Sequence, residues 1–303
     1  MENKELLLSI CIPTNGVVEW VVPVIESIYA QGVDNALFEV VITDNGEKDD
    51  LQVAVKKYNY PNLNYSRNNA KGFTNQIEAF EKCQGVFCKM LNHRSIMLPG
   101  SIMALIEFVR KYQDTKPILY CAEGNAKGGD YIECANTDEF VKSMSYFVSW
   151  SGGTGAWKDD LRCNLRSKSI DCFFPHFLFL FGLRDETQYV IWNGKYEEMA
   201  DDAGKGGYDL FKVFGVNLLD YINNLRIQNR IEIGSFLRVK EDLYDFLGGL
   251  YLNEVLLPTN HTFIIQNVEQ SMSVYYGRYY YKNMVLKARL KEFKYSIMHL
   301  FKK

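Results

Sequence analysis

Residues 6–15, LLLSICIPTN, and residues 38–50, FEVVITDNGEKDD, decide the fold. Each begins as an apolar run rich in Ile and Val and passes directly into polar residues, and a short helical stretch lies between the two. Such runs are typical of strands that are buried on both faces, and the order strand, helix, strand predicts a right-handed parallel crossover. Ligands of such sheets bind at the carboxyl ends of the strands, so the residues that end the two strands should line one crevice, which we interpret as a nucleotide site. These residues are Pro13, Thr14, Asn15, Asp44, Asn45 and Gly46.

Length and composition are those of a globular α/β protein. The chain has 303 residues, of which 47% are hydrophobic, enough to fill a sizeable core. A net charge of -3 gives no reason to expect a nucleic-acid partner. The seven cysteines lack the close spacing of a zinc site or a small disulfide framework, and we expect reduced thiols. The first residues do not form a signal-peptide pattern, and no run of about 18 apolar residues occurs, so we predict a cytoplasmic protein.

The alternation of helices and strands continues through the first half of the chain. We predict helices at 51–58, from about Asn75 and from Pro99 to about 112, and strands at 62–67, 86–92, 117–122 and 189–196. Beyond these the pattern is mostly helical, with helices predicted at 211–225, 235–257 and from 261 onward. The sequence therefore predicts an α/β domain at 1–195 and a helical C-terminal extension at 196–303.

Four short motifs follow one another along the first third of the chain. They are PTN after the first strand, DNG after the second, RNNAKGFTN at Arg67–Asn75 and MLPGS at Met97–Ser101. Their order and spacing resemble a family-two glycosyltransferase of the GT-A fold, over about residues 6–110. The resemblance implies a Rossmann-like α/β domain with a mixed, mostly parallel sheet flanked by helices. It also implies transfer of a single sugar, with inversion, from a nucleoside diphosphate sugar to a hydroxyl of a glycan or lipid-linked saccharide, as in bacterial surface-polysaccharide synthesis.

In the family that the chain resembles, these strand ends hold the base and ribose of the donor. Asp44 matches the aspartate that accepts a hydrogen bond from the imide N–H of the base, which favours a UDP-sugar. An alternative stays open for Asp44, which could simply be the turn aspartate of the DNG sequence. Asn75, the last residue of the RNNAKGFTN motif, could simply cap the helix that begins there. The rest of the donor set implied by the resemblance is Pro13, Thr14, Asn15, Asn45, Arg67 and Asn69.

His93, Arg94 and Ser95 stand where the resembled family has an acidic DxD-like cluster that binds Mg²⁺ or Mn²⁺. A hard divalent cation prefers oxygen ligands, which an imidazole and a guanidinium do not supply, so we expect neither a metal nor another cofactor. One interpretation is that Arg94 binds the diphosphate in place of the cation, with hydrogen bonds from His93 or Ser95. The alternatives are a catalytically inactive domain that serves as a binding or scaffolding partner of another transferase, and side chains that merely pair with surface acids.

The segment at 144–161, MSYFVSWSGGTGAWKDDL, combines aromatic residues with glycines that allow a ligand to approach the backbone. It resembles the acceptor-side segment of these transferases. We assign acceptor binding to Gly153, Thr154 and Trp157, whose indole would pack against sugar C–H groups. The alternative is a glycine-rich bulge with aromatic core residues.

An inverting transferase needs a base that deprotonates the acceptor hydroxyl. Asp171 precedes an apolar stretch that would bury it partly, and His176 follows five residues later, so both are candidate catalytic residues beside Arg94. Asp171 is alternatively a helix N-cap and His176 a core histidine. Asp185 or Glu186 is a further candidate for the base.

The stretch at 272–303 carries eight basic residues against the single acid Glu292, with tyrosines and aliphatic residues between them. A basic amphipathic helix of this kind can lie on an anionic membrane. We therefore predict peripheral attachment to the inner face of the plasma membrane. Oligomerisation through the same helices, as a homo-oligomer, and simple capping of the domain are the alternatives.

Overall fold

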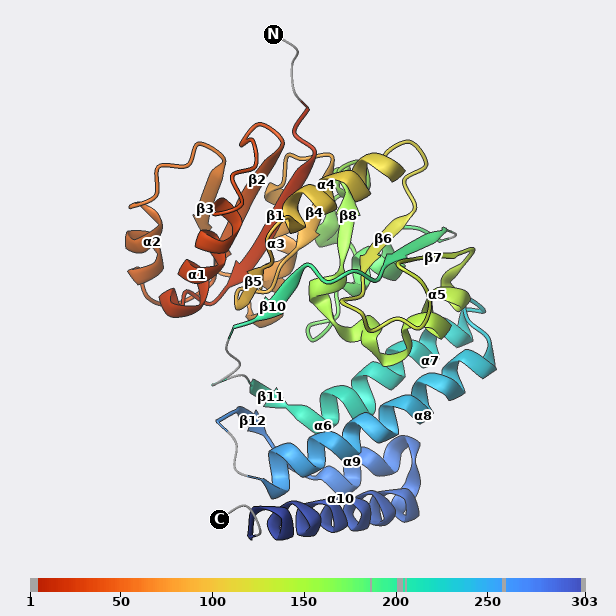
Figure 1. Cartoon of the computed structure of the whole chain (residues 1–303). Coiled ribbons are helices and arrows are strands. Elements are labelled where there is room, and N and C mark those ends of the chain that lie inside the picture. Colours follow the sequence, from red (N-terminus) through yellow and green to blue (C-terminus); the bar gives the residue numbers. More distant parts are fainter. Residues whose placement is uncertain (1–4, 186, 201–203, 205, 258–259, 301–303) are drawn as a thin grey trace. The chain divides into compact units, whose positions relative to one another are not determined.

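The structure, a computed structural model, describes residues 5–185, 187–200, 204, 206–257 and 260–300 (Figure 1). The chain divides into two compact units, Met1–Asp201 and Asp202–Lys303. Residues 196–200, which the sequence assigned to the C-terminal extension, belong to the first unit, because the strand at 197–199 pairs with a strand of that unit.

A five-stranded sheet of order β3-β2-β1-β4-β8 forms the centre of the first unit (Figure 1). Its strands are β1 (Leu8–Thr14), β2 (Phe38–Asp44), β3 (Leu63–Arg67), β4 (Phe87–Met90) and β8 (Gly155–Trp157). The first four run parallel, and β8 is antiparallel to β4. The register places Thr14 beside Asp44 and Asp44 beside Arg67, so the ends of three strands meet at one edge, as the sequence predicted.

Helices pack on both faces of this sheet. They are α1 (Val18–Tyr29), α2 (Asp50–Val55), α3 (Asn75–Lys82) and α4 (Ser101–Tyr112). Successive residues of β1 enter two different core clusters: Ile10 and Ile12 pack with residues of α1 and α4, whereas Cys11 packs with residues of α3. Because side chains alternate along a strand, a strand covered on both faces is apolar nearly throughout. This is the origin of the continuous apolar run in the sequence.

A second sheet, of order β6-β9-β7, lies beside β8. Its strands are β6 (Ile118–Cys121), β7 (Tyr131–Cys134) and β9 (Tyr189–Trp192), and the helix α5 (Thr137–Met144) follows β7. A bridge between Tyr120 and Thr154 connects it to the segment that enters β8. After β4, the short strand β5 (Ser95–Met97) pairs antiparallel with β10 (Glu197–Met199). The whole unit is thus the mixed, mostly parallel α/β architecture that the sequence predicted.

Residues 144–161, the segment that combines aromatic residues with glycines, form mostly turns. Short 3₁₀ turns occupy Ser145–Ser149 and Ser151–Gly153, and only β8 is extended. Close packing is the reason, because a Cβ at Gly153 would overlap the ring of Tyr120 and a Cβ at Gly155 would overlap the ring of Phe87. The glycines therefore let aromatic rings lie directly against this backbone.

The described part of the second unit is mostly helical. Its elements are α6 (Leu210–Lys212), α7 (Leu219–Ile227), α8 (Ile233–Leu250), α9 (Val268–Tyr275), α10 (Gly277–Leu300), β11 (Gly206–Asp209) and β12 (Thr262–Ile264). A π-helical segment at Val213–Leu218 connects α6 to α7, and a second one at Tyr251–Leu256 continues α8. The pairing of β11 with β12 was not predicted, because residues from 261 onward carried a helical pattern. Among the described residues, no helix is long and apolar enough to cross a membrane.

Candidate functional site

The edge of the sheet at the ends of β1 and β4 brings together residues that the sequence singled out. Thr14 Oγ1 accepts a hydrogen bond from Gly16 N (3.1 Å) and lies 2.8 Å from His93 Nδ1. Burial, together with the neighbouring positive charge of Arg94, lowers the pKa of His93 to about 4, so the imidazole is neutral at neutral pH. Its ring packs against Trp20 of α1 with the ring centroids 5.3 Å apart. This edge, called the rim below, therefore joins the end of β1 to the residues that follow β4.

Arg94 lies over the indole of Trp20, with the guanidinium carbon 3.3 Å from the ring centroid. The residue is only 7% exposed, and its backbone is fixed by hydrogen bonds from Arg94 N to Asn92 Oδ1 and from Ala200 N to Arg94 O. A guanidinium on an aromatic face uses its π surface and directs its N–H groups outward in its own plane. The stack therefore holds a positive charge at the end of β4.

Asp44 is completely buried at the end of β2. Its Oδ1 accepts a hydrogen bond from Gly46 N, and its Oδ2 accepts one from the hydroxyl of Tyr65, both at 2.7 Å. Gly16 and Gly46 make room for the carboxylate, because a Cβ at either position would lie 2.9 Å from Oδ1. The structure thus gives Asp44 the turn role that was the alternative in the sequence, and its contact with a nucleotide base stays a prediction.

Two further members of the predicted donor set hold the loops of the rim in place. Arg67 forms an ion pair with Asp49 and donates a hydrogen bond to Gly46 O, both across the loop after β2. Asn45 Nδ2 donates to Ala70 O at 2.9 Å. Their polar groups are therefore occupied by neighbouring loops in this structure.

The remaining members of the donor set differ in exposure. Asn15 and Asn69 are exposed, Pro13 is partly buried within β1, and Ser95 is buried as the first residue of β5. The two exposed amides are therefore the members of this group that a ligand could contact without any change in the structure.

Asn75 joins two strands rather than capping its helix. Its Nδ2 donates to Thr14 O at 3.0 Å and to Thr43 O at 2.8 Å, and the residue that precedes α3 is Thr74. The side chain thereby links the carbonyl groups of Thr14 and Thr43 on the neighbouring strands β1 and β2.

The three predicted acceptor residues, Gly153, Thr154 and Trp157, are all buried. Trp157 Nε1 donates to Pro117 O at 2.6 Å, and the indole meets the ring of Phe87 edge to face with centroids 4.9 Å apart. The indole therefore belongs to the core and has no free face for a sugar. This matches the alternative of a glycine-rich segment with aromatic core residues.

The two predicted bases have different environments. Asp171 is partly exposed, and its Oδ1 accepts hydrogen bonds from Phe173 N (2.8 Å) and Phe174 N (2.9 Å), an Asx-type turn. It is not the N-cap that was the alternative, because the next helical segment begins at Leu178, after Phe177. His176 is buried, and its Nε2 donates to Val148 O at 3.1 Å. Burial lowers the pKa of His176 to about 4. His176 is thus a neutral core histidine, whereas Asp171 remains accessible.

The other acids considered for catalysis or metal binding give no cluster in the described part of the chain. Asp185 is exposed before β9, and Glu186 lies outside the described residues. Within the ranges that the structure describes, no three His, Cys, Asp or Glu side chains gather in a way that could hold a metal ion. Asp201 and Asp202, which follow β10, lie outside these ranges.

The sequence interpretation missed a buried charged cluster behind the rim. Lys89, in the middle of β4, is fully buried, and its Nζ donates to Met90 O (2.7 Å), to Gly152 O and to the hydroxyl of Tyr196 (3.0 Å). Lysine is almost never fully buried unless its charge is compensated. A lysine inside the apolar strand VFCKMLN was therefore the signal that could have revealed this cluster.

Glu197 of β10 is the acid of this cluster. It is 8% exposed, and burial, partly offset by the nearby Lys89, raises its pKa to about 7. In the pairing of β10 with β5, Met199 lies opposite Ser95, and the next residue bonds to Arg94 O. Lys89 and Glu197 are thus located on the two strands that support the turn carrying His93 and Arg94.

We expect Glu197→Gln to change the pH dependence of stability. The carboxyl binds its proton more tightly in the folded chain, with a pKa of about 7 against an ordinary value of 4.5, so the free energy of unfolding of the parent protein falls as pH rises through this window. Between pH 4.5 and about 7, the free energy of unfolding of Glu197→Gln should therefore rise by about 3 kcal/mol relative to that of the parent protein. Urea unfolding at the two ends of the window measures this shift. Tryptophan fluorescence reports on the first unit alone, because Trp20, Trp150, Trp157 and Trp192 all lie there.

Glu198→Gln is the matched control, because Glu198 is the next residue of β10 and is exposed. Its stability difference from the parent should not depend on pH. A Glu197→Gln difference that is equally independent of pH would contradict a buried, protonated carboxyl.

Comparison with known proteins finds a family match over the region that contains this site. The family model described as glycosyl transferase family 2 matches residues 9–137, which contain β2, β4, all of β1 but its first residue, and the rim residues Thr14, Trp20, His93 and Arg94. No curated protein matches the chain.

Several solved structures of TarS from S. aureus share the fold. TarS 1-349 superposes with a TM-score of 0.54 at 14% sequence identity, over 81% of this chain and 72% of that chain. Its complexes with UDP-GlcNAc and with UDP give TM-scores of 0.50 and 0.51 at 14% and 15% identity, with the same coverage. Residues 9–137 of the chain thus match glycosyl transferase family 2, and the chain shares the fold of these structures, which is the GT-A fold.

Proposed function

We propose that this glycosyltransferase uses a UDP-sugar and transfers one sugar, with inversion, to a hydroxyl of a glycan or lipid-linked saccharide in surface-polysaccharide synthesis, without a divalent cation. The observation that carries the proposal is the guanidinium of Arg94, held on Trp20 at the end of β4. The TarS complexes with UDP-GlcNAc and UDP support UDP as the nucleotide.

On the donor side, Arg94 takes the part that a divalent cation plays in other transferases. Its planar fork can bind two oxygens of the diphosphate and stabilise the charge that develops as the sugar departs. The neutral ring of His93, beside Thr14, adds hydrogen-bonding capacity without a competing charge. The positive charge at the rim is therefore provided by the chain itself.

On the acceptor side, Asp171 is the proposed general base. The described contacts of its carboxylate are both made by Oδ1, which leaves Oδ2 to accept a proton from the attacking hydroxyl. These two hydrogen bonds fix the orientation of the carboxylate, so the turn and catalysis are compatible at this residue. The hydroxyl would attack in line with the departing diphosphate, which gives inversion.

We expect UDP release from UDP-GlcNAc to continue in EDTA, with a rate that changes by less than about twofold, because no step passes through a metal ion. The measurement is UDP release with and without EDTA and with added Mn²⁺. Loss of activity in EDTA that Mn²⁺ restores would contradict the role of Arg94. Retained UDP binding without any turnover would instead favour the inactive binding partner.

A further inference from the structure

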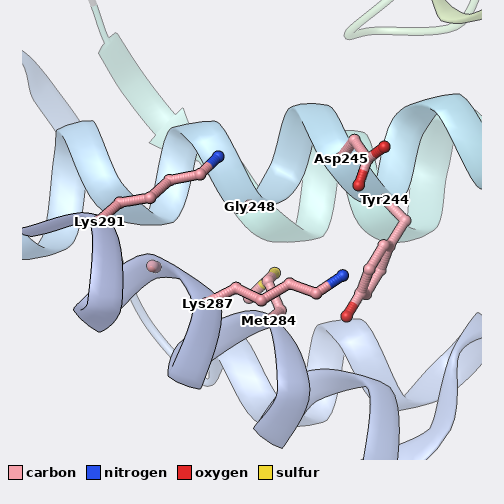
Figure 2. Close-up of a pocket in the computed structure, with 7 residues that line it drawn as sticks. Tyr244, Asp245, Gly248, Met284, Lys287 and Lys291 are labelled. Carbon is pink, nitrogen blue, oxygen red and sulfur yellow. The ribbon is translucent and has the colours of Figure 1, made fainter.

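The helix α10 carries two apolar faces, and one of them packs within its own unit. Met284 and Ala288 are buried and face α8, where Met284 lies beside Gly248 (Figure 2). A Cβ at Gly248 would be 3.5 Å from Met284 Cγ, an ordinary van der Waals separation. This buried face accounts for the attachment of α10 to the rest of the unit.

The opposite face of α10 is apolar as well, but it is open. Its members are Tyr279, Leu286, Leu290 and Phe293, which are between 55% and 77% exposed. At 3.6 residues per turn these four side chains fall within about 60° of the helix circumference, on the far side from Met284 and Ala288. They extend over about 21 Å of helix. We call these four residues the exposed stripe.

Basic residues flank the exposed stripe on both sides. Counted around the helix, one flank holds Arg278, Lys282 and Arg289, and the other holds Lys287, Lys291 and Lys294. Figure 2 shows the long side chains of Lys287 and Lys291 running along the border between α10 and α8. The acid of this helix, Glu292, lies 3.6 Å from Arg289 in an ion pair. Arg278 is paired as well, with Glu269 at 2.7 Å, so the net positive charge around the stripe comes from the four flanking lysines.

This charge distinguishes between two occupants of the exposed stripe. A second copy of the chain would bring two sets of lysines and arginines together, and like charges across an interface oppose association. An anionic lipid surface complements the same charges, while the apolar side chains enter the headgroup layer and the lysine stems extend toward the phosphates. We propose that the exposed stripe docks α10 on an anionic lipid bilayer.

Vesicle co-sedimentation of the full chain tests this proposal. The parent protein should sediment with vesicles of equal parts phosphatidylglycerol and phosphatidylcholine and stay in solution with phosphatidylcholine alone, and salt should weaken binding. Leu286→Glu/Leu290→Glu should bind at least about tenfold more weakly. Leu237→Glu is the matched control, because Leu237 on α8 is 52% exposed against 55% for Leu290, and its binding should equal that of the parent.

A second variant separates charge from apolar area. Lys287→Glu/Lys294→Glu leaves the four apolar side chains in place and should also lose at least about tenfold in binding. Circular dichroism melts of each variant check that the second unit is folded.

The proposal is overturned if the parent does not sediment, if neutral vesicles bind equally well, or if the Leu286→Glu/Leu290→Glu variant binds like the parent. A parent dimer that this variant converts to a monomer would assign the stripe to a second copy and would also overturn it. The proposal does not depend on the donor chemistry, so its failure would leave the proposed function untouched.

Discussion

Replacing Arg94 with alanine should lower kcat about 100- to 1000-fold and change the KM for the UDP-sugar much less. The proposed function assigns the guanidinium to the charge that develops on the departing diphosphate. Such stabilisation acts mainly in the transition state, so its loss appears in turnover rather than in substrate binding. Steady-state measurement of UDP release from UDP-GlcNAc gives both constants.

Two further variants show whether this effect belongs to the guanidinium at position 94. Arg94→Lys keeps the charge but loses the planar fork and the stack on Trp20, so its kcat should fall between those of the parent and Arg94→Ala. Arg67→Ala removes the other arginine of the rim, whose donors already bind Asp49 and Gly46 O, and its kcat should change little. Equal losses in Arg67→Ala and Arg94→Ala would show that position 94 has no special role. Thermal melts of all three variants check that the fold is intact.

Lys89→Met should lower the free energy of unfolding of the first unit by about 3 to 5 kcal/mol. The substitution removes the donor to Met90 O, to Gly152 O and to the Tyr196 hydroxyl, and it leaves the buried carboxyl of Glu197 without the positive charge that compensates it. A loss of this size is a large fraction of the stability of a typical domain. Urea unfolding followed by tryptophan fluorescence measures it.

The loss in Lys89→Met should also depend on pH. At a pH well below 7 the carboxyl of Glu197 is protonated, because its pKa is about 7, so removal of the lysine leaves no uncompensated negative charge and the destabilisation should be smaller. Lys82→Met, at an exposed position on α3, should change stability by less than about 0.5 kcal/mol at any pH. Similar losses in the two variants would contradict a structural role for Lys89.

Local patterns were sufficient to predict the sheet and its functional edge. The apolar runs and their polar ends identified β1 and β2, and the parallel register then placed Thr14 beside Asp44. The helix from Pro99 to about 112 was predicted from its Pro-Gly start and its apolar spacing, and α4 occupies Ser101–Tyr112. These features depend on neighbouring residues in the chain, which is why a single sequence contains them.

Features that depend on distant parts of the chain were not accessible in the same way. Trp157 is in the core because its indole reaches Pro117, and the burial of Lys89 depends on the return of the chain at Gly152 and Tyr196. Neither contact leaves a periodic pattern in the sequence. The stack of Arg94 on Trp20 is similar, because it needs the start of α1 and the end of β4 to meet.

The crowding around the Asp44 carboxylate limits how this loop can diverge during evolution. A side chain at position 46 would overlap the carbonyl oxygen of Asn15, which belongs to the main chain, so no substitution nearby can make room for it. Position 16 is restricted by its φ of +82° as well as by the carboxylate. The acid itself is held by hydrogen bonds from Gly46 and Tyr65, which an amide oxygen could accept in part. Lineages that retain this loop can therefore exchange the acid more readily than either glycine.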